Sequence, residues 1–323
     1  MTNINTLYGT PNTRAGLAES PVWDDAASCW YWIDIPNRQI HRHTFDEVHT
    51  LWQLPQTDAS DPGALCISTD GTLIVALRAG LARFDPATPA GDVTLAVFLD
   101  APYDTSTIRF NDGGVDAAGR FWVGSLFAPK THNGASLYCL EKGTLHTALG
   151  EDAPHAPQNQ WGTITSNGWA MSPDGHRVHH ADTQAHTSYI YDFDANQPIE
   201  TALSNRRAFY QSQTQAQAKE AGTVYQGRPD GAAMDSAGNY WNAQFEGGQV
   251  VQLSPTGDII QRLMLPARCP TMVCFGGADL KTLIVTTTGN RPEDELVDYP
   301  ANGFILKIQV EIAGLPTRRY VAA

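Results

Sequence analysis

The chain has 323 residues, of which 42% are hydrophobic, and its formal net charge is −13. The length suffices for one domain with a sizeable core, and the acidic balance argues against nucleic acid as a partner, because phosphate binding needs a basic surface. No run approaches the roughly 18 consecutive apolar residues of a membrane span. The five cysteines are scattered without a CxxC pair, and the N-terminus lacks the charged and apolar regions of a signal peptide. We therefore expect a cytoplasmic protein that is a monomer or a weak homo-oligomer.

One sequence motif recurs about six times along the chain. It consists of a short apolar stretch, a turn rich in Asp and Gly, and a second stretch rich in Trp, Val or Ile. Repeats of this kind are typical of ring-shaped and solenoid folds. In chain order, the turns lie at 24–25, 70–71, 116–119, 174–175, 235–238 and 277–279.

Short β-rich runs between Gly, Pro, Asp and Asn turns fill each repeat, and long helical patterns are nearly absent. Four strands per repeat and six repeats predict an all-β fold, a six-bladed β-propeller of antiparallel blades forming one domain over residues 1–323. In the second repeat we expect the third strand at Gly80–Asp85 and the outer strand at Val93–Leu99. A strand at Ile4–Tyr8 or at Ala15–Leu17 should close the ring beside the C-terminal strand Gly303–Val310, which removes an exposed edge.

Three segments are longer than a blade needs. Gly150–Thr163, which includes Trp161, and Gly289–Asn302 read as loops, and Ser204–Gly227 contains a Gln/Ala-rich stretch that could form one short helix. Long loops at one end of a propeller are natural walls of a pocket.

The repeats align on the glycine of the turn, and a polar residue stands eight positions before that glycine in three copies. The first copy lacks the glycine but aligns through Trp30. Equivalent positions in a ring of blades meet at one end of the central channel, so four oxygen-bearing side chains should converge there. Such oxygens are hard ligands for a divalent cation, although Asn and Asp also favour strand ends for local reasons. The four are Glu19, Asn111, Asn167 and Asp230; the other two copies carry Gly63 and a position near Met272.

At these residues the chain resembles the SMP-30/gluconolactonase/regucalcin family of six-bladed propellers. The matching phrases extend from about residue 17 to residue 310, and together they are specific. They are Leu17-Ala-Glu19-Ser-Pro-Val-Trp23, Arg109-Phe-Asn111-Asp112-Gly-Gly-Val-Asp116, Gly119-Arg-Phe-Trp122-Val-Gly, Ser166-Asn167-Gly168, Gly227-Arg-Pro-Asp230-Gly231 and Phe275-Gly-Gly-Ala-Asp279.

The resemblance implies a metal ion bound by Glu19, Asn167 and Asp230, with Asn111 beside it as a ligand or substrate contact. It also implies that Arg109 reaches substrate oxygens. The ion could be Ca²⁺, Zn²⁺, Mn²⁺, Mg²⁺ or Fe²⁺, since all tolerate such ligands. Many animal members carry an acidic pair where this chain has 127–130, so their substrate preference does not transfer.

The implied activity is hydrolysis of a small sugar (aldono) lactone to the aldonic acid in sugar catabolism. Asp230 is the candidate base as well as a ligand, and Asp112 is the reserve. Arg109, Asn111 and Asp112 are the candidate substrate-binding residues, although Arg109 could instead form an ion pair with Asp112 or Asp116. The alternatives are a metal-dependent phosphotriesterase or arylesterase on the same fold, and a non-catalytic calcium-binding propeller.

Other sequence patterns do not support a further catalytic or metal site. His179 and His180 are neighbours in a strand and should face opposite sides, so they cannot chelate one ion together. No GxSxG motif supports a serine nucleophile. Of the tryptophans, Trp161 and Trp169 are the two that could lie near a pocket, and the others are expected to pack the blades.

Overall fold

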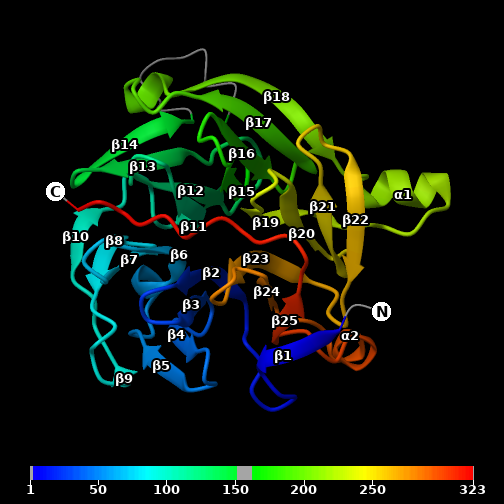
Figure 1. The fold of residues 1–323 in the computed structure, drawn as a ribbon, viewed down its shortest axis with the longest axis horizontal. Helices are drawn as coiled ribbons and strands as arrows, with labels where there is room; N and C mark the ends of the chain where they lie inside the picture. The colour runs from blue at the N-terminus through cyan, green and yellow to red at the C-terminus, as the bar shows by residue number, and fades with distance from the viewer. Residues whose placement is uncertain (1–2, 151–161, 323) are drawn as a thin grey trace.

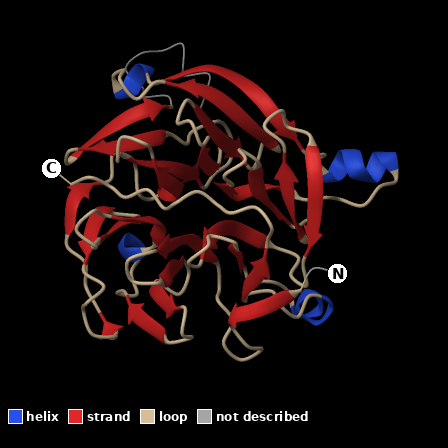
Figure 2. Cartoon of the chain, in the orientation of Figure 1, coloured by secondary structure: helices blue, strands red, loops and turns tan. Residues whose placement is uncertain are grey.

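The computed structural model describes residues 3–150 and 162–322. Within these ranges the strands form six sheets arranged in a ring, which confirms the predicted six-bladed β-propeller (Figures 1 and 2). No helix in the described ranges is long and apolar enough to cross a membrane.

Each blade is an antiparallel sheet whose first strand lies next to the channel. The strands of the first three blades, from the inner edge outward, are β2 (Ala18–Asp24), β3 (Cys29–Asp34), β4 (Gln39–Thr44) and β5 (His49–Gln53); β6 (Pro62–Ile67), β7 (Leu73–Leu77), β8 (Gly80–Phe84) and β10 (Val97–Asp100); and β11 (Ile108–Val115), β12 (Phe121–Phe127), β13 (Leu137–Glu141) and β14 (Thr144–Leu149).

The strands of the last three blades, in the same order, are β15 (Ser166–Met171), β16 (Arg177–Asp182), β17 (Thr187–Phe193) and β18 (Leu203–Gln211); β19 (Arg228–Met234), β20 (Tyr240–Phe245), β21 (Gln249–Leu253) and β22 (Ile259–Met264); and β23 (Pro270–Gly276), β24 (Thr282–Thr287), β25 (Ile305–Gln309) and β1 (Ile4–Tyr8).

The N-terminal strand closes the ring, as predicted. β1 pairs antiparallel with β25, with Ile4 opposite Ile308, so the sixth blade joins both ends of the chain. β1 thus covers the outer edge of β25, which would otherwise be open to pairing.

Two expectations need correction, the outer strand of the second blade and the segment 289–302, and one, the short helix, is confirmed. The outer strand of the second blade is β10, because the chain at β9 (Gly91–Asp92) first pairs in parallel with β5 of the neighbouring blade. The Gln/Ala-rich stretch does form a short helix, α1 (Gln215–Ala221), which begins at a capping box on Thr214 and projects from the edge of the ring (Figure 1). The segment 289–302, expected as a loop, contains the helix α2 (Glu293–Asp298).

The aspartates stabilise the turn of the repeated sequence motif. In the third blade Asp116 accepts hydrogen bonds from the amides of Ala118 (2.8 Å) and Arg120 (3.0 Å), and its other oxygen accepts one from the indole of Trp122 at 2.8 Å. Asp235 binds its own turn and Trp241 in the same way. The aspartate therefore fixes the turn and also provides a partner for the N–H of a buried tryptophan.

The hydrophobic core lies between blades. Six clusters of buried side chains each join the facing surfaces of two neighbouring blades, for example Trp122 of blade 3 stacked on Trp169 of blade 4 with ring centroids 5.1 Å apart. Because every blade is packed on both faces, the ring holds its shape without a central core, and the channel remains available for polar groups.

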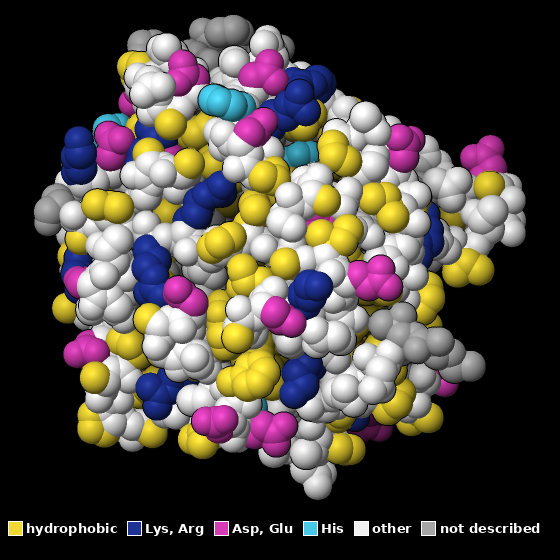
Figure 3. All heavy atoms as spheres, in the orientation of Figure 1, with side chains coloured by type: hydrophobic (Ala, Val, Ile, Leu, Met, Phe, Trp, Pro, Cys, Tyr) yellow, Lys and Arg dark blue, Asp and Glu magenta, His cyan; other side chains and the backbone are white. Residues whose placement is uncertain are grey.

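After β25 the chain crosses one face of the ring (Figure 1). This C-terminal segment (residues 311–322) exchanges backbone hydrogen bonds with several blades: Ser236 N with Ala313 O, Gly314 N with Leu280 O and Tyr320 N with Ile67 O, each at 2.8 Å. Basic, acidic and apolar side chains are interspersed on the face that it crosses (Figure 3). The segment thus covers one end of the channel.

Candidate functional site

Every inner strand is irregular at the same place. The pairing register shifts between Glu19 and Val22, Pro62 and Ala64, Asn111 and Gly113, Asn167 and Ala170, Pro229 and Ala232, and Pro270 and Met272. A β-bulge re-aims the side chain beside it, so the four aligned polar residues leave the plane of their blades at one level of the channel.

The backbone just after three of these residues has positive φ, and at the two that are not glycine it is strained. Ser20, Asp112 and Gly168, which follow Glu19, Asn111 and Asn167, have φ values of +50°, +24° and +62°. Such conformations are costly for residues other than glycine, and they persist where the surrounding structure demands them, typically at functional sites. The positive φ of Ser20 and Asp112 could not be predicted from residue type, because neither is a glycine.

The four aligned residues line one cavity of about 560 Å³ at an end of the channel, together with Arg109. They are deeply buried, with 8% of Glu19, 6% of Asn111, 3% of Asn167 and 7% of Asp230 exposed. The structure therefore brings together five of the six residues predicted for the site. Blade 2 has no side chain at the aligned position, because the space for a side chain on Gly63 is filled by the carbonyl of Phe110 in the next blade.

A hydrogen-bond network orients the two amides. The Thr183 hydroxyl donates to Pro229 O at 2.8 Å and so accepts from Asn167 Nδ2 at 2.7 Å. Asn167 Oδ1 consequently faces away from Thr183, where it accepts a hydrogen bond from Asn111 Nδ2 at 2.8 Å. Thr183, which sequence reasoning missed, thus fixes the direction of an oxygen that the proposed metal site needs.

Asn111 is arranged differently from Asn167. Its Nδ2 also donates to Ser166 O, and its Oδ1 accepts from Arg109 Nη1 at 2.9 Å. Each of the two amide oxygens thus accepts one hydrogen bond, Asn167 Oδ1 from Asn111 and Asn111 Oδ1 from Arg109, and each keeps a second lone pair. Asn111 positions both Arg109 and Asn167, and its oxygen can still bind a ligand.

The two carboxylates lie in an electrostatically unfavourable place. Burial, with the negative charges of Asp230 and Asp112, raises the pKa of Glu19 well above its usual range. Burial and then Asp112 raise the pKa of Asp230, although Arg228 and Arg109 oppose the shift. Among the described residues neither carboxylate forms an ion pair. Two buried acids without a cationic partner favour a bound cation.

Asp112 lies behind the cavity and is not among the residues that line it. Its carboxylate accepts hydrogen bonds from the amides of Gly113 (2.6 Å) and Trp169 (3.2 Å). Burial raises the pKa of Asp112 to about 7. In this structure Asp112 connects two blades below the site and has no direct route to a ligand in the cavity.

Arg109 is held by Asn111 and by its own strand. Its Nη1 donates to Phe110 O at 2.8 Å as well as to Asn111, and no ion pair with Asp112 or Asp116 exists. Asp116 is engaged instead by Arg120 at 2.6 Å. In the described part of the chain Arg109 Nη2 and Nε have no hydrogen-bond partner, so they remain able to donate to a ligand.

The residues present fit a divalent cation. Glu19 and Asp230 supply carboxylate oxygens, and Asn167 supplies an amide oxygen whose direction Thr183 fixes. Hard cations such as Ca²⁺ and Mg²⁺ take such oxygens and complete their shells with water or substrate. No group of three or more His, Cys, Asp and Glu side chains in the described ranges meets with metal-binding geometry, so an amide oxygen is needed to complete this set.

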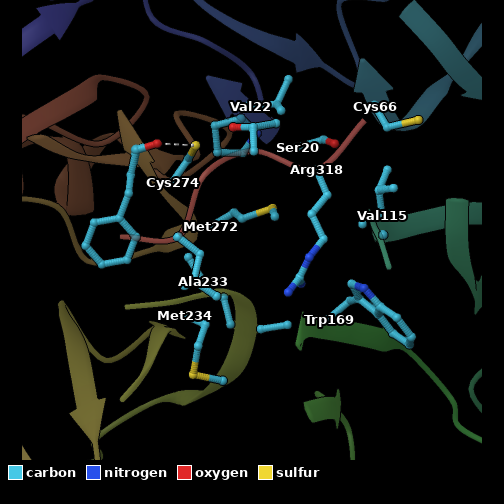
Figure 4. Close-up of a pocket in the computed structure, with 18 of the residues that line it drawn as sticks. Ser20, Val22, Cys66, Val115, Trp169, Ala233, Met234, Met272, Cys274 and Arg318 are labelled. Carbon is cyan, nitrogen blue, oxygen red and sulfur yellow. Dashed lines mark hydrogen bonds between the residues drawn. The ribbon is translucent and has the colours of Figure 1, made fainter. Parts of the chain in front are cut away.

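The opposite end of the channel is smaller and mainly apolar. A cavity of about 160 Å³ is lined there mainly by apolar side chains, including Val115, Trp169 and Met272, and the C-terminal segment closes it. Figure 4 shows Arg318 of this segment reaching into the cavity between Trp169 and Ala233. Trp169 therefore lies near a pocket, but not near the predicted site, and Trp161 lies outside the described residues.

The histidines serve the blades. His179 stacks on Tyr240 with centroids 4.8 Å apart, whereas His180 Nε2 bonds to Ser166 Oγ at 2.6 Å. The two rings therefore have different partners, as expected for neighbours in a strand.

Comparisons with known proteins agree with this architecture. Residues 17–289 match the family model of the SMP-30/gluconolactonase/LRE-like region. The chain belongs to this family. A 6-deoxy-6-sulfogluconolactonase from Pseudomonas putida is 39% identical over 92% of this chain and 92% of its own. A pentonolactonase from Haloferax volcanii is 29% identical over 97% of this chain and 98% of its own.

The fold has solved relatives. The crystal structure of regucalcin from Agrobacterium tumefaciens, described as a calcium-binding protein, superposes with a TM-score of 0.81. It covers 99% of this chain and 97% of its own, at 23% identity. This likeness confirms the propeller.

Proposed function

We propose that this family member is a divalent-metal-dependent hydrolase of sugar lactones, with Glu19, Asn167 and Asp230 as the metal ligands. One observation carries the proposal: two buried carboxylates without ion-pair partners face one cavity with a carbonyl oxygen of an oriented amide. The names of two relatives, a sulfogluconolactonase and a pentonolactonase, support lactones as the substrate class. The two named sugars differ, and only one of the names denotes a charged substituent.

The chain's own groups suit the reaction. A metal bound there would polarise the lactone carbonyl and acidify a nearby water. Asp230 accepts a proton from the attacking water, and Arg109 donates hydrogen bonds to the carbonyl oxygen or to ring hydroxyls. The bond between the carbonyl carbon and the ring oxygen breaks, and the ring oxygen takes up the proton that Asp230 holds. The product is a hydroxy acid, whose ionisation releases one proton to solvent.

The test compares hydrolysis of aldono-1,4- and 1,5-lactones by metal-stripped and metal-restored protein. The proposal expects turnover only with metal, and weakened metal binding in Asp230→Asn by calorimetry. An exposed carboxylate outside the site, Glu47, whose side chain is 77% exposed, provides the matched control Glu47→Gln. Equal turnover without metal would contradict the metal dependence. Turnover of aryl esters or phosphotriesters alone would favour the esterase alternative, and metal binding without any turnover would favour a calcium-binding propeller.

A further inference from the structure

Positive charge gathers at the candidate site of an otherwise acidic protein. Six of the 21 Lys and Arg residues line the site cavity, against three carboxylates, whereas the whole chain has a net charge of −13. A cavity that only had to hold a metal and a neutral sugar would not need this excess. The six cations are Arg38, Arg78, Arg109, Lys130, Arg228 and Arg291.

On the side of blades 5 and 6 the charges are balanced. Arg228 lies 3.4 Å from Glu246, and Arg291 is bound to Glu295 at 2.6 Å. These pairs leave little net charge for a ligand.

On the side of blades 1 to 3 the charges are not balanced. Two buried carboxylates line this side, Glu19, which is a proposed metal ligand, and Asp61, which Arg38 and Arg78 share at 2.8 Å each. The second partner of Arg38 is Asp58, whose side chain is 87% exposed and therefore well screened. Arg109 and Lys130 form no ion pair with any described residue. The excess of positive charge is therefore local to this side.

Three of these cations converge at the edge of blade 3, and we call them the blade-3 cationic rim: Arg78, Arg109 and Lys130. Arg78 Nη1 donates to Thr105 O at 3.2 Å, just before β11, which carries Arg109. The Ala128 amide donates to Thr107 O at 2.8 Å, which holds the turn bearing Lys130 against the same strand.

The rim is electrostatically costly without a ligand. Burial and the nearby charge of Arg78 both lower the pKa of Arg109, although Glu19 and Asp61 act in the opposite direction. Like charges held together in a partly buried place repel one another, and an anion between them relieves the repulsion. Arginine forks match the oxygens of carboxylate, phosphate and sulfonate groups, and lysine adds a point charge.

We propose that the substrate is an anionic lactone, whose negatively charged substituent on an exocyclic carbon is held by the blade-3 cationic rim. This inference rests on the proposed lactonase function and names its substrate class. The lactone carbonyl lies toward Glu19 and Asp230, and the anionic group lies toward Lys130 at the outer part of the cavity.

The experiment measures kcat/KM for D-glucono-1,5-lactone and for its analogues with phosphate, sulfonate or carboxylate at C6. We expect at least one anionic lactone to be preferred by about tenfold or more at low salt, because charge complementarity speeds encounter and orients the ligand. Its kcat/KM should fall as salt rises, and that of the neutral lactone should not. The three analogues distinguish the kinds of anion.

Lys130→Met tests the exposed end of the rim, because Lys130 lines the cavity and its side chain is exposed. We expect the ratio of kcat/KM for the preferred anionic lactone to that for the neutral lactone to fall about fivefold in this variant, mainly through the KM of the anionic lactone. Lys130→Arg should restore the preference. Lys142→Met, at an exposed lysine of the turn between β13 and β14, is the matched control.

Equal kcat/KM for neutral and anionic lactones, or equal losses in Lys130→Met for both, would overturn the anionic subsite while leaving the lactonase intact. Absence of turnover with every lactone would instead refute the proposed function on which the inference rests.

Discussion

The two ends of the central channel are built from the same six inner strands, yet they differ in almost every property. One end is a cavity of about 560 Å³ lined by buried carboxylates, amides and cations. The other is a cavity of about 160 Å³ lined mainly by apolar groups and closed by the C-terminal segment (Figures 1 and 4). The bulges in the inner strands mark the boundary between the two.

This difference shows how a symmetric fold acquires one site. At the closed end, apolar side chains and backbone hydrogen bonds stabilise the ring, so changes there should affect folding. At the open end, two carboxylates are buried without ion pairs among the described residues, and a bound cation would offset the cost of burying them. Changes there should therefore affect binding and turnover.

The largest expected effect is at the open end. Glu19→Gln removes one of the two anionic ligands without changing the shape of the side chain. We expect kcat/KM for lactones to fall by about a thousandfold, since a bound metal supplies several kcal/mol of transition-state stabilisation. The thermal midpoint of the metal-free protein should not fall. Loss of the folded state, with activity lost only through aggregation, would count against a catalytic site.

At the closed end the expectation is reversed. Tyr320 is 2% exposed and packs between blades 2 and 3. Tyr320→Ala should lower the free energy of unfolding by about 3 kcal/mol, measured by denaturant titration, because a large buried ring leaves a cavity. The kcat of the folded fraction should be unchanged. Val321→Ala is the matched control, since Val321 is 50% exposed; a loss of kcat in Tyr320→Ala would show that the two ends are coupled.

A smaller effect is expected at Thr183, which contacts the proposed metal ligand Asn167 by a hydrogen bond. Thr183→Val removes the hydroxyl that orients Asn167, and metal affinity should weaken by about tenfold to a hundredfold. Thr165→Val is a close control, because Thr165 is 5% exposed, lines the same cavity, and has a hydroxyl without a hydrogen-bond partner among the described residues. Metal affinities of both variants are measured by calorimetric titration. Equal affinities would show that the Thr183 hydroxyl does not orient a metal ligand.

The smallest effect is a pH dependence of the metal-free protein. The pKa of Asp112 is about 7 in the folded state and near its ordinary value of 3.8 when unfolded. The folded state therefore holds more protons between these values, and stability should rise as pH falls. Between pH 8 and pH 6 Asp112 should contribute about 1.4 kcal/mol.

The check is the difference between wild type and Asp112→Asn, both without metal. The lowered pKa values of buried His179 and His180, about 3, oppose the trend below about pH 6.5, but they are common to both proteins and cancel. Asp112→Asn also removes the charge that raises the pKa values of Glu19 and Asp230, so the difference in slope reports the three coupled acids together. Identical slopes in the two proteins would contradict the burial of an ionisable Asp112.

Much of the fold could be predicted because its determinants are local. The turn aspartates Asp116 and Asp235 mark the repeats, and alignment on the turn glycine places Glu19, Asn167 and Asp230 at one level of the ring. The environment of Asp112 was not predictable in this way. Its neighbour Asn111 faces the cavity, and a bulge turns Asp112 behind it, which depends on backbone conformation rather than on residue type.

The cationic rim could not be predicted from the alignment of the repeats either. Arg78 and Lys130 lie at different places in their repeats and meet only because strand β11 follows the loop that Arg78 binds. Thr183 was missed for the same reason: its role depends on the carbonyl of Pro229 in the next blade. These features of the site depend on contacts between blades, which residue spacing within one blade does not predict.

Metal-dependent lactone hydrolysis can be tested by proton release from a sugar lactone, followed in a pH-stat with protein stripped of metal and then restored. Our prediction is that the stripped protein does not exceed the spontaneous rate of ring opening, that one divalent ion per chain restores turnover, and that Asp230→Asn is not restored. Full turnover by the stripped protein, or restoration of Asp230→Asn by the same ion, would contradict it.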